Sequence, residues 1–279
     1  MRVAIAGSSG LIGTHLSRAL RERGDDVVAL PRVGTAPWSV EGADAVVNLA
    51  GASVAGKRWT PAYKKEIEES RIRSTRAAVE AIAAARRKPR VLVNASAVGY
   101  YGGRGDEILD EGAGPGADFL AGVCQRWEAE AQRAPVRAVQ LRTGVVLSPK
   151  GGALEKMLPP FKAFVGGPVG SGKQWFPWIH VADEVGAILW AIDRDVAGPL
   201  NLVAPGIVTM KDFSKALGRA LHRPSWAPVP AAPLRVLLGE FALVLLEGQR
   251  AVPKRLLDSG FRFQFADVDA ALRDVLAAR

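Results

Sequence analysis

Apolar residues along this chain alternate between strand-length runs and helical patterns. Residues 3–6 are apolar, and apolar side chains then recur on one helical face of residues 11–20. Further apolar runs lie at 27–30, 45–49, 90–94, 136–141 and 200–203, between helical patterns at 61–85, 118–132, 182–193 and 209–221. This alternation predicts an α/β fold, a doubly wound parallel sheet with helices on both faces.

The pattern is less regular after residue 150. Prolines, glycines and aromatic residues fill 150–178 and predict loops or a small lobe, and one helix is expected over 231–248. We therefore expect three parts: a core at 1–150 to which elements around 182–205 return, a mixed substrate lobe at 151–248, and a helical tail at 249–279.

Three glycines at a spacing of three separate the first strand from the first helix. Gly7 allows a sharp turn, Gly10 allows the backbone to approach phosphates, and Gly13 allows helix and strand to pack closely. The spacing is one residue wider than the usual Gly-x-Gly-x-x-Gly. A strand, a glycine loop and a helix N-terminus in this order predict dinucleotide binding by Gly7, Ser8, Ser9, Gly10, Leu11, Ile12 and Gly13.

The end of the second strand bears on which dinucleotide binds. Enzymes that use NAD usually place an acid there, but this strand ends Leu30-Pro31-Arg32, and Asp25 and Asp26 precede it. Arg32 could form charge-assisted hydrogen bonds with a 2′-phosphate, or it could be a solvated surface arginine. We favour NADP as the cofactor.

Composition excludes several classes of protein. The chain has 279 residues, 48% of them hydrophobic, which is enough for a sizeable core. No apolar stretch has the length of a membrane span, so we expect no membrane partner. Cys124 is the single cysteine and the three histidines are far apart in sequence. A cytoplasmic protein without a metal site is therefore expected.

The formal net charge of +9 is concentrated in residues 1–100. A basic N-terminal region suits a phosphorylated cofactor and an anionic substrate. The densest run of cations, Arg86 to Arg90, lies between a helix and a strand and has no interleaved aromatic residues. We interpret it as a solvated helix end and expect no nucleic-acid partner.

Several motifs at strand ends resemble those of the extended short-chain dehydrogenase/reductases. They are Gly7-x-x-Gly10-x-x-Gly13, Asn48-Leu-Ala-Gly51, Ser96-Ala-Val-Gly-Tyr-Tyr-Gly102 and Trp178-Ile-His-Val-Ala-Asp183. Longer stretches are similar to an atypical branch, the NAD-dependent epimerase family proteins with a small conserved tail domain. They include Gly56–Trp59, Gly151–Leu154, Met157–Phe161, Gly166–Gly172, Gln174–His180, Glu247–Arg250 and Pro253–Leu257.

This resemblance, which covers nearly the whole chain, implies a Rossmann core, bound NADP(H) and a small-molecule substrate that is not established. It also implies that Leu49, Ala50 and Gly51 lie beside the cofactor. The long helices after Pro61 and Asp118 pair in many relatives to form a four-helix interface, so a homodimer is plausible by resemblance.

The chain departs from the broader group at its acid/base pair. Ordinary members use a tyrosine and a lysine four residues later, and the lysine lowers the pKa of the tyrosine. None of the three tyrosines of this chain is followed by lysine at that spacing. Phe119 and Val123 occupy the corresponding helix positions, so the usual pair is absent.

Four residues are candidates to replace this pair. Ser96 matches the catalytic serine of the group, or it could cap a turn. Tyr100 and Tyr101 could bring a phenol into the site, or they could anchor a loop by packing. His180 is of a residue type whose usual pKa suits proton transfer near neutral pH, or it could be a buried core residue whose ring nitrogens are hydrogen-bonded.

Two arginines are candidates for binding the anionic groups of the cofactor or substrate. Arg71 and Arg142 could each reach a phosphate or carboxylate, and for each a buried ion pair with a nearby acid is an equal alternative. Trp175, Phe176 and Trp178 could form an aromatic wall for a flat or sugar-like ligand, or they could pack under a loop.

Two functions remain open. The first is an NADP(H)-dependent oxidoreductase or epimerase that acts on a small polar substrate such as a nucleotide sugar. The second is a catalytically inactive, cofactor-binding regulatory protein, since the family has carried cell-division-inhibitor labels. The absent tyrosine–lysine pair favours the second function, whereas Ser96 and the patterned region 150–180 favour the first.

Overall fold

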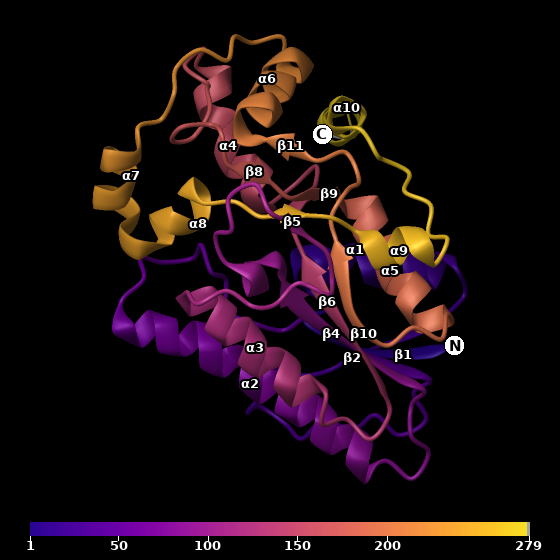
Figure 1. Ribbon diagram of the computed structural model, residues 1–279. Coiled ribbons are helices and arrows are strands. Elements are labelled where there is room, and N and C mark those ends of the chain that lie inside the picture. The colour runs from indigo at the N-terminus through magenta and orange to yellow at the C-terminus, as the bar shows by residue number, and fades with distance from the viewer. Residues whose placement is uncertain (278–279) are drawn as a thin grey trace. The chain divides into compact units, whose positions relative to one another are not determined.

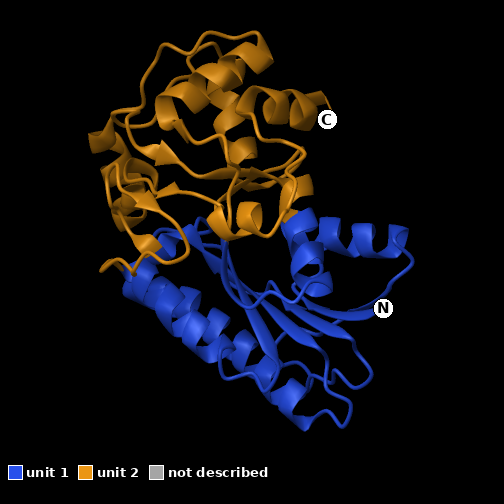
Figure 2. Cartoon of the chain, turned by 45° about the vertical axis from the view of Figure 1, so that its right-hand side comes forward, with its two compact units in different colours: residues 1–100, 119–142, 185–200 blue, residues 101–118, 143–184, 201–279 orange. Residues whose placement is uncertain are grey.

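The structure is a computed structural model that describes residues 1–277 and contains two compact units. The final two residues of the expected tail, 278–279, lie outside the described residues. Figure 2 colours the units separately: unit 1 contains residues 1–100, 119–142 and 185–200, and unit 2 contains residues 101–118, 143–184 and 201–279.

The central sheet has six strands, in the order β10-β6-β4-β3-β1-β2. Their bounds are β1 (Arg2–Ala6), β2 (Asp26–Ala29), β3 (Ala45–Asn48), β4 (Val91–Ala97), β6 (Arg137–Thr143) and β10 (Gly198–Leu202). β1 pairs in parallel with both β2 and β3, and β3 pairs in parallel with β4. All four residues of β3 are buried, as expected for a strand covered on both faces. The expected parallel α/β sheet is confirmed.

The strand order places a topological switch at β1. After β1 the chain pairs β2 on one side, and it then returns to pair β3 on the other side. In open α/β sheets, ligands bind outside the carboxyl ends of the strands at such a switch. The loops that follow β1 and β3 are therefore the place to look for a ligand site.

Four α-helices cover this sheet, and their bounds agree closely with the expected ones. They are α1 (Leu11–Glu22), α2 (Pro61–Ala84), α3 (Phe119–Ala131) and α5 (Val181–Asp193), with a short 3-10 helix, η1 (Val98–Tyr101), after β4. Thr60 caps α2 by accepting a hydrogen bond from the Tyr63 backbone amide. α2 and α3 lie side by side (Figure 1) and are joined by the Trp127 indole, which donates to Thr75 Oγ1.

The described part of unit 2 contains three short strand pairs. β7 (Val145–Leu147) pairs in parallel with β9 (Trp178–His180), and β5 (Ile108–Leu109) in parallel with β12 (Arg250–Ala251). β8 (Trp175–Phe176) pairs antiparallel with β11 (Val208–Thr209). The helices are α4 (Gly152–Lys162), α6 (Met210–Leu221), α7 (Ala231–Leu238), η2 (Gly239–Phe241), α8 (Ala242–Leu246), α9 (Lys254–Asp258) and α10 (Val268–Ala277).

Each unit has its own apolar core. In unit 1 the cluster joins the sheet to α2 and includes Val46, Ile82 and Leu92, all fully buried. In unit 2 the cluster joins α4, α6 and α10 around Trp178 and Phe213. Burial of this apolar area is the main favourable contribution to the stability of each unit.

The region 150–178, for which the sequence predicts loops or a small lobe, contains the helix α4. Leu154, Leu158 and Phe161 are buried at intervals of four and three, which is helical spacing. Pro159 and Pro160 lie inside the helix and suggested a loop in the sequence. Packing of the apolar face against the core of unit 2 overrides the cost of the prolines.

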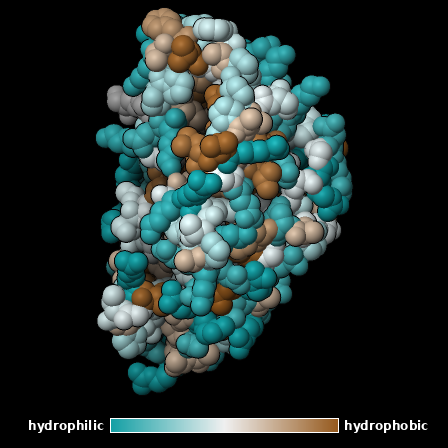
Figure 3. Space-filling model, turned by 90° about the vertical axis from the view of Figure 1, so that its left-hand side faces the viewer, coloured by the Kyte–Doolittle hydropathy of each residue, from teal (hydrophilic) through white to brown (hydrophobic). Residues whose placement is uncertain are grey.

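The single helix expected over 231–248 is wrong. α7 ends at Leu238 because Gly239 has a φ of +61°, and the chain continues as η2 and α8. No residue of α7 is buried, and apolar side chains gather on the surface over α7 and α8 (Figure 3). The tail is helical in α9 and α10, but it also contributes β12.

Candidate functional site

The glycine loop after β1 folds into a tight turn that excludes side chains. Gly7 has a φ of +79°, and its carbonyl accepts a hydrogen bond of 3.0 Å from the Gly10 amide. A Cβ at Gly13 would lie 2.1 Å from the same carbonyl oxygen, so only glycine fits there. α1 begins without a side-chain cap and without an acid in its first turn. Its first backbone amides can therefore bind an anion.

The loop after β3 lies directly against the glycine loop. A Cβ at Gly7 would lie 2.9 Å from the Leu49 carbonyl carbon and 3.0 Å from the Ala50 nitrogen. Asn48 shapes this second loop, because its Oδ1 accepts from the Ala50 amide at 3.2 Å. The expected Leu49-Ala50-Gly51 segment thus borders the glycine loop.

A buried polar network that the sequence analysis missed supports Asn48. Its amide nitrogen donates to Asn94 Oδ1 at 2.7 Å and to Thr75 Oγ1 at 3.0 Å. Asn48 and Asn94 are register partners on β3 and β4, and both are fully buried. The signal that could have found the network was an asparagine at equivalent positions of two apolar strands.

Arg32 follows β2 at its carboxyl end and is exposed. Among residues 1–277 its guanidinium forms no ion pair. Asp25 lies at the other end of the strand, where it binds the N-terminal amine and the Arg23 side chain. The carboxyl end of β2 therefore offers a cation and no acid, as the sequence indicates.

Arg71 lies beside the same loops. A Cβ at Gly51 would lie 3.2 Å from Arg71 Cγ, and the guanidinium donates to the Ala52 and Ile67 carbonyls at 3.0 and 2.8 Å. Burial lowers the pKa of this guanidinium, and no carboxylate in the described part of the chain pairs with it. The ion-pair alternative does not apply to Arg71, which remains suited to an external anion.

Arg142, in contrast, forms the buried ion pair. Its Nε and Nη2 donate to the two carboxylate oxygens of Glu128, both at 2.9 Å, and the two side chains are 4% and 6% exposed. Ser96 Oγ donates to Glu128 Oε1 at 2.6 Å. The sequence did not reveal Glu128 because an acid within a helix usually indicates a solvated face.

Tyr100 and Tyr101 are neighbours in sequence but have different surroundings. The Tyr100 ring is half-buried in unit 1, and the centre of the Arg142 guanidinium lies 3.5 Å from its centroid. Tyr101 is fully buried in unit 2, where its hydroxyl donates to Asn201 Oδ1 at 2.7 Å. The structure therefore groups Tyr100 with Ser96 and Arg142, and it places Tyr101 in a separate core.

His180 lies in unit 2 and is almost fully buried. Its ring stacks on Phe265 with 3.8 Å between centroids, and Nε2 lies 3.1 Å from Asp274 Oδ2. Nδ1 accepts a hydrogen bond from the Ala182 amide. Both ring nitrogens of His180 therefore contact residues of unit 2.

The positions of the missing acid/base pair carry no replacement. Phe119 packs edge-on against Trp59, with the Lys64 ammonium 4.4 Å from its ring centroid. Val123 is buried. The neighbouring Cys124 is buried too, which raises the pKa of its thiol to about 12 and keeps it neutral.

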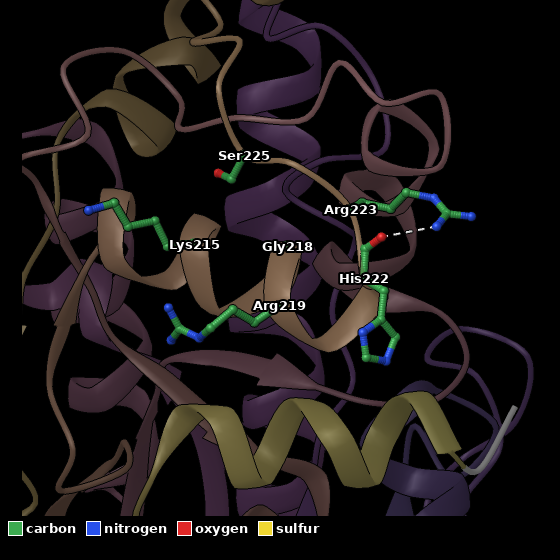
Figure 4. Close-up of a pocket in the computed structure, with 6 residues that line it drawn as sticks. All are labelled: Lys215, Gly218, Arg219, His222, Arg223 and Ser225. Atoms are coloured by element: carbon green, nitrogen blue, oxygen red, sulfur yellow. Dashed lines mark hydrogen bonds between the residues drawn. The ribbon is translucent and has the colours of Figure 1, made fainter.

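A basic concavity of about 530 Å³ lies at the end of α6. Figure 4 shows Lys215 and Arg219 on one side and Arg223 pointing away on the other. Arg219 pairs with Asp269 at 2.7 Å, and Arg223 donates to the His222 carbonyl. These cations do not converge on one point, so we assign no ligand to this concavity.

Two further features bear on the class of site. No set of three or more potential metal ligands gathers among residues 1–277. Among the helices of the same residues, none combines the length and the hydropathy required to cross a bilayer.

Comparisons with known proteins cover nearly all of the chain. The model of the NAD dependent epimerase/dehydratase family matches residues 3–203, and a domain of unknown function, DUF1731, matches residues 229–275. Epimerase family protein YfhF of Bacillus subtilis is 39% identical, with 100% of this chain and 99% of that protein covered. The chloroplastic SDR39U1 homologue of Arabidopsis thaliana is 42% identical, with 99% and 87% covered.

Two solved structures are similar in both sequence and fold. Human epimerase family protein SDR39U1, crystallised with NADPH, is 36% identical with a TM-score of 0.95 and 99% of each chain covered. A nucleoside-diphosphate sugar epimerase from Corynebacterium glutamicum is 34% identical with a TM-score of 0.81. All of this chain and 58% of that chain are covered.

Proposed function

This chain belongs to the NAD dependent epimerase/dehydratase family, and we propose that it is an NADP(H)-dependent oxidoreductase or epimerase acting on a small polar substrate. The observation that carries the proposal is the glycine loop at the sheet's switch point, where Gly7 and Gly13 leave no room for a Cβ. The NADPH bound to human SDR39U1, a relative with the same fold, supports the choice of cofactor.

The residues around the strand ends of unit 1 fit this dinucleotide. The backbone of Gly7 to Gly13 would bind the pyrophosphate. Arg32 would bind the 2′-phosphate, because its guanidinium has no ion-pair partner among residues 1–277. The Leu49-Ala50-Gly51 backbone would border the cofactor, and Arg71 would contribute positive charge. When bound, the nicotinamide would accept or donate a hydride.

We assign proton transfer to Tyr100. Its phenol belongs to the group formed with Ser96, Glu128 and Arg142 and can act as a general acid or base. Arg142 stacks on the ring and orients it, and Glu128 fixes Arg142 through two hydrogen bonds. The Ser96 hydroxyl donates a hydrogen bond to Glu128, so Ser96 acts as a positioning residue for the same group. This arrangement would replace the tyrosine–lysine pair without using the same helix.

The experiment that tests the proposal follows deuterium from 4-deuterated NADPH into a panel of aldoses, ketones and nucleotide sugars, with detection by mass spectrometry. We expect transfer by the wild type. Tyr100→Phe should reduce turnover by a factor on the order of 100, since it removes the proton donor but retains the ring. Ser96→Ala should reduce turnover by much more than it reduces NADPH affinity.

Tyr101→Phe is the matched control. It also removes one phenol, but that phenol binds Asn201 inside unit 2, so turnover should change by less than about threefold while the folded state loses about 1 kcal/mol. Equal turnover of Tyr100→Phe and wild type would remove Tyr100 from the mechanism. NADPH binding without transfer to any compound would favour the regulatory alternative, which none of the comparisons supports.

A further inference from the structure

A cavity of about 310 Å³ lies within unit 2, apart from the basic concavity on α6. Its walls come from three segments that are far apart in sequence: residues 103–106, 173–175 and 246–248. All three segments overlap or adjoin motifs that the sequence analysis singled out and that the cofactor does not explain. We call it the Trp175 cavity.

The aromatic wall of this cavity is held in one orientation. The Trp175 indole nitrogen donates to Asp106 Oδ1 at 2.8 Å, and the Arg250 guanidinium lies 4.5 Å from the centroid of the Trp175 ring. Arg250 also donates to the Asp106 backbone carbonyl at 3.2 Å. Trp175 remains half-exposed, so part of an oriented aromatic surface faces the cavity.

Two glycines bring the segments together. A Cβ at Gly248 would lie 2.0 Å from the Trp175 carbonyl oxygen, so the chain at 248 passes directly over the backbone of β8. A Cβ at Gly103 would lie 2.5 Å from Glu247 Oε2, so the Glu247 carboxylate packs against the Gly103 backbone where a side chain would otherwise be. The cavity therefore depends on glycine at both positions.

Two charged groups that line the cavity have no partner in the described part of the chain. Among residues 1–277, neither the Lys173 ammonium nor the Glu247 carboxylate forms an ion pair or a side-chain hydrogen bond. The polar groups of the aromatic wall, in contrast, bind one another. Fixed walls with free charges in the lining are the arrangement expected of a pre-formed ligand site.

The balance of charge limits the chemistry of the ligand. Asp106 and Glu247 supply two carboxylates, and Lys173 is the single cation of the lining. Arg250, behind the Trp175 ring, brings the surrounding charges to two carboxylates and two cations, so the cavity offers a diphosphate no net attraction. A hydroxylated molecule would place its C–H face on Trp175, donate hydroxyl protons to Glu247 and accept from Lys173.

We propose that the Trp175 cavity binds a small, non-phosphorylated, polyhydroxylated molecule, and that Trp175, Glu247 and Lys173 are its binding residues. Where this molecule is the substrate, the proposal rests on the oxidoreductase function proposed above. In that case the substrate class is a neutral polyol or aldose rather than a nucleoside diphosphate.

The test is ligand-observed NMR by saturation transfer on the full chain, with D-glucose, D-galactose, D-xylose, D-glucitol and UDP-glucose as probes. The wild type should give saturation transfer to at least one of the four neutral probes, and UDP-glucose should bind no more tightly than that probe. Trp175→Ala should abolish the signal. The matched control Trp226→Ala, which removes an exposed tryptophan outside the cavity, should retain it.

Glu247→Gln keeps the proposal testable if Trp175→Ala does not fold. The Glu247 carboxylate has no partner among residues 1–277. This variant should therefore fold normally and bind the neutral probe about tenfold more weakly. Absence of binding by all neutral probes would overturn the proposal. Unchanged binding by Glu247→Gln, or UDP-glucose binding at least about tenfold tighter than the neutral probes, would also overturn it.

NADPH binding, measured by fluorescence on the same samples, separates the two proposals. Normal NADPH binding without polyol binding would remove only the proposal for the cavity. Polyol binding without NADPH binding would remove only the proposed oxidoreductase function.

Discussion

The strand ends of unit 1 and the Trp175 cavity of unit 2 use charged side chains in opposite ways. In unit 1, Glu128 and Arg142 are buried and bind each other through two hydrogen bonds. At the Trp175 cavity, Lys173 and Glu247 are exposed, and neither side chain forms an ion pair or a hydrogen bond among residues 1–277. Paired buried charges fix the geometry of a site, whereas free charges on fixed walls are available to a ligand.

The largest effect should come from breaking the paired group. Arg142→Ala leaves the Glu128 carboxylate buried without a cation, and we expect a loss of about 3–5 kcal/mol in the free energy of unfolding. Urea denaturation measures this loss. Glu247→Gln is the control at the other region, and it should change stability by less than about 0.5 kcal/mol. Similar losses in both variants would remove the distinction between the two regions.

Glu184 of α5 adds a third case to the comparison of paired and free charges. It is a buried acid that forms no ion pair among residues 1–277. The Thr143 hydroxyl donates to it at 2.9 Å, and burial raises its pKa to about 8 from 4.5. Because its folded pKa lies above the unfolded one, the contribution of Glu184 to stability is greatest below pH 4.5 and is lost as pH rises through 8. The fall approaches about 1.4 kcal/mol per pH unit in this window.

Glu184→Gln should remove this pH dependence, because glutamine is neutral throughout. Urea denaturation at pH 5, 6.5 and 8 gives the free energy of unfolding of both proteins. The difference between variant and wild type should rise in favour of the variant by on the order of 3 kcal/mol from pH 5 to pH 8. Parallel pH profiles would show that Glu184 does not carry the cost of a buried charge.

The parts of the fold that could be predicted are those in which local pattern and tertiary packing agree. The apolar run of β1, the glycine loop and the apolar face of α1 lie together in sequence and follow from it directly. α4 could not be predicted in this way, because Pro159 and Pro160 indicated a loop while burial of Leu154 and Leu158 decided the structure.

The residues of the candidate site also fall into those that local sequence indicates and those that depend on tertiary packing. Residues that contribute backbone or lie at strand ends, such as Gly7 and Arg32, can be proposed for the site from spacing alone. Glu128 could not, since its role depends on meeting Arg142 and Ser96 from other elements. The different surroundings of Tyr100 and Tyr101 are likewise invisible in the sequence, where the two residues are adjacent.

The most direct test of the central claim is a titration of NADPH and NADH against wild type, Arg32→Ala and the control Arg18→Ala. Arg18 is also exposed, but it lies on α1, where Glu22 pairs with it. We predict that wild type and Arg18→Ala bind NADPH at least about tenfold more tightly than NADH, about 1.4 kcal/mol, and that Arg32→Ala loses this margin. Failure of the wild type to bind either dinucleotide would contradict the account.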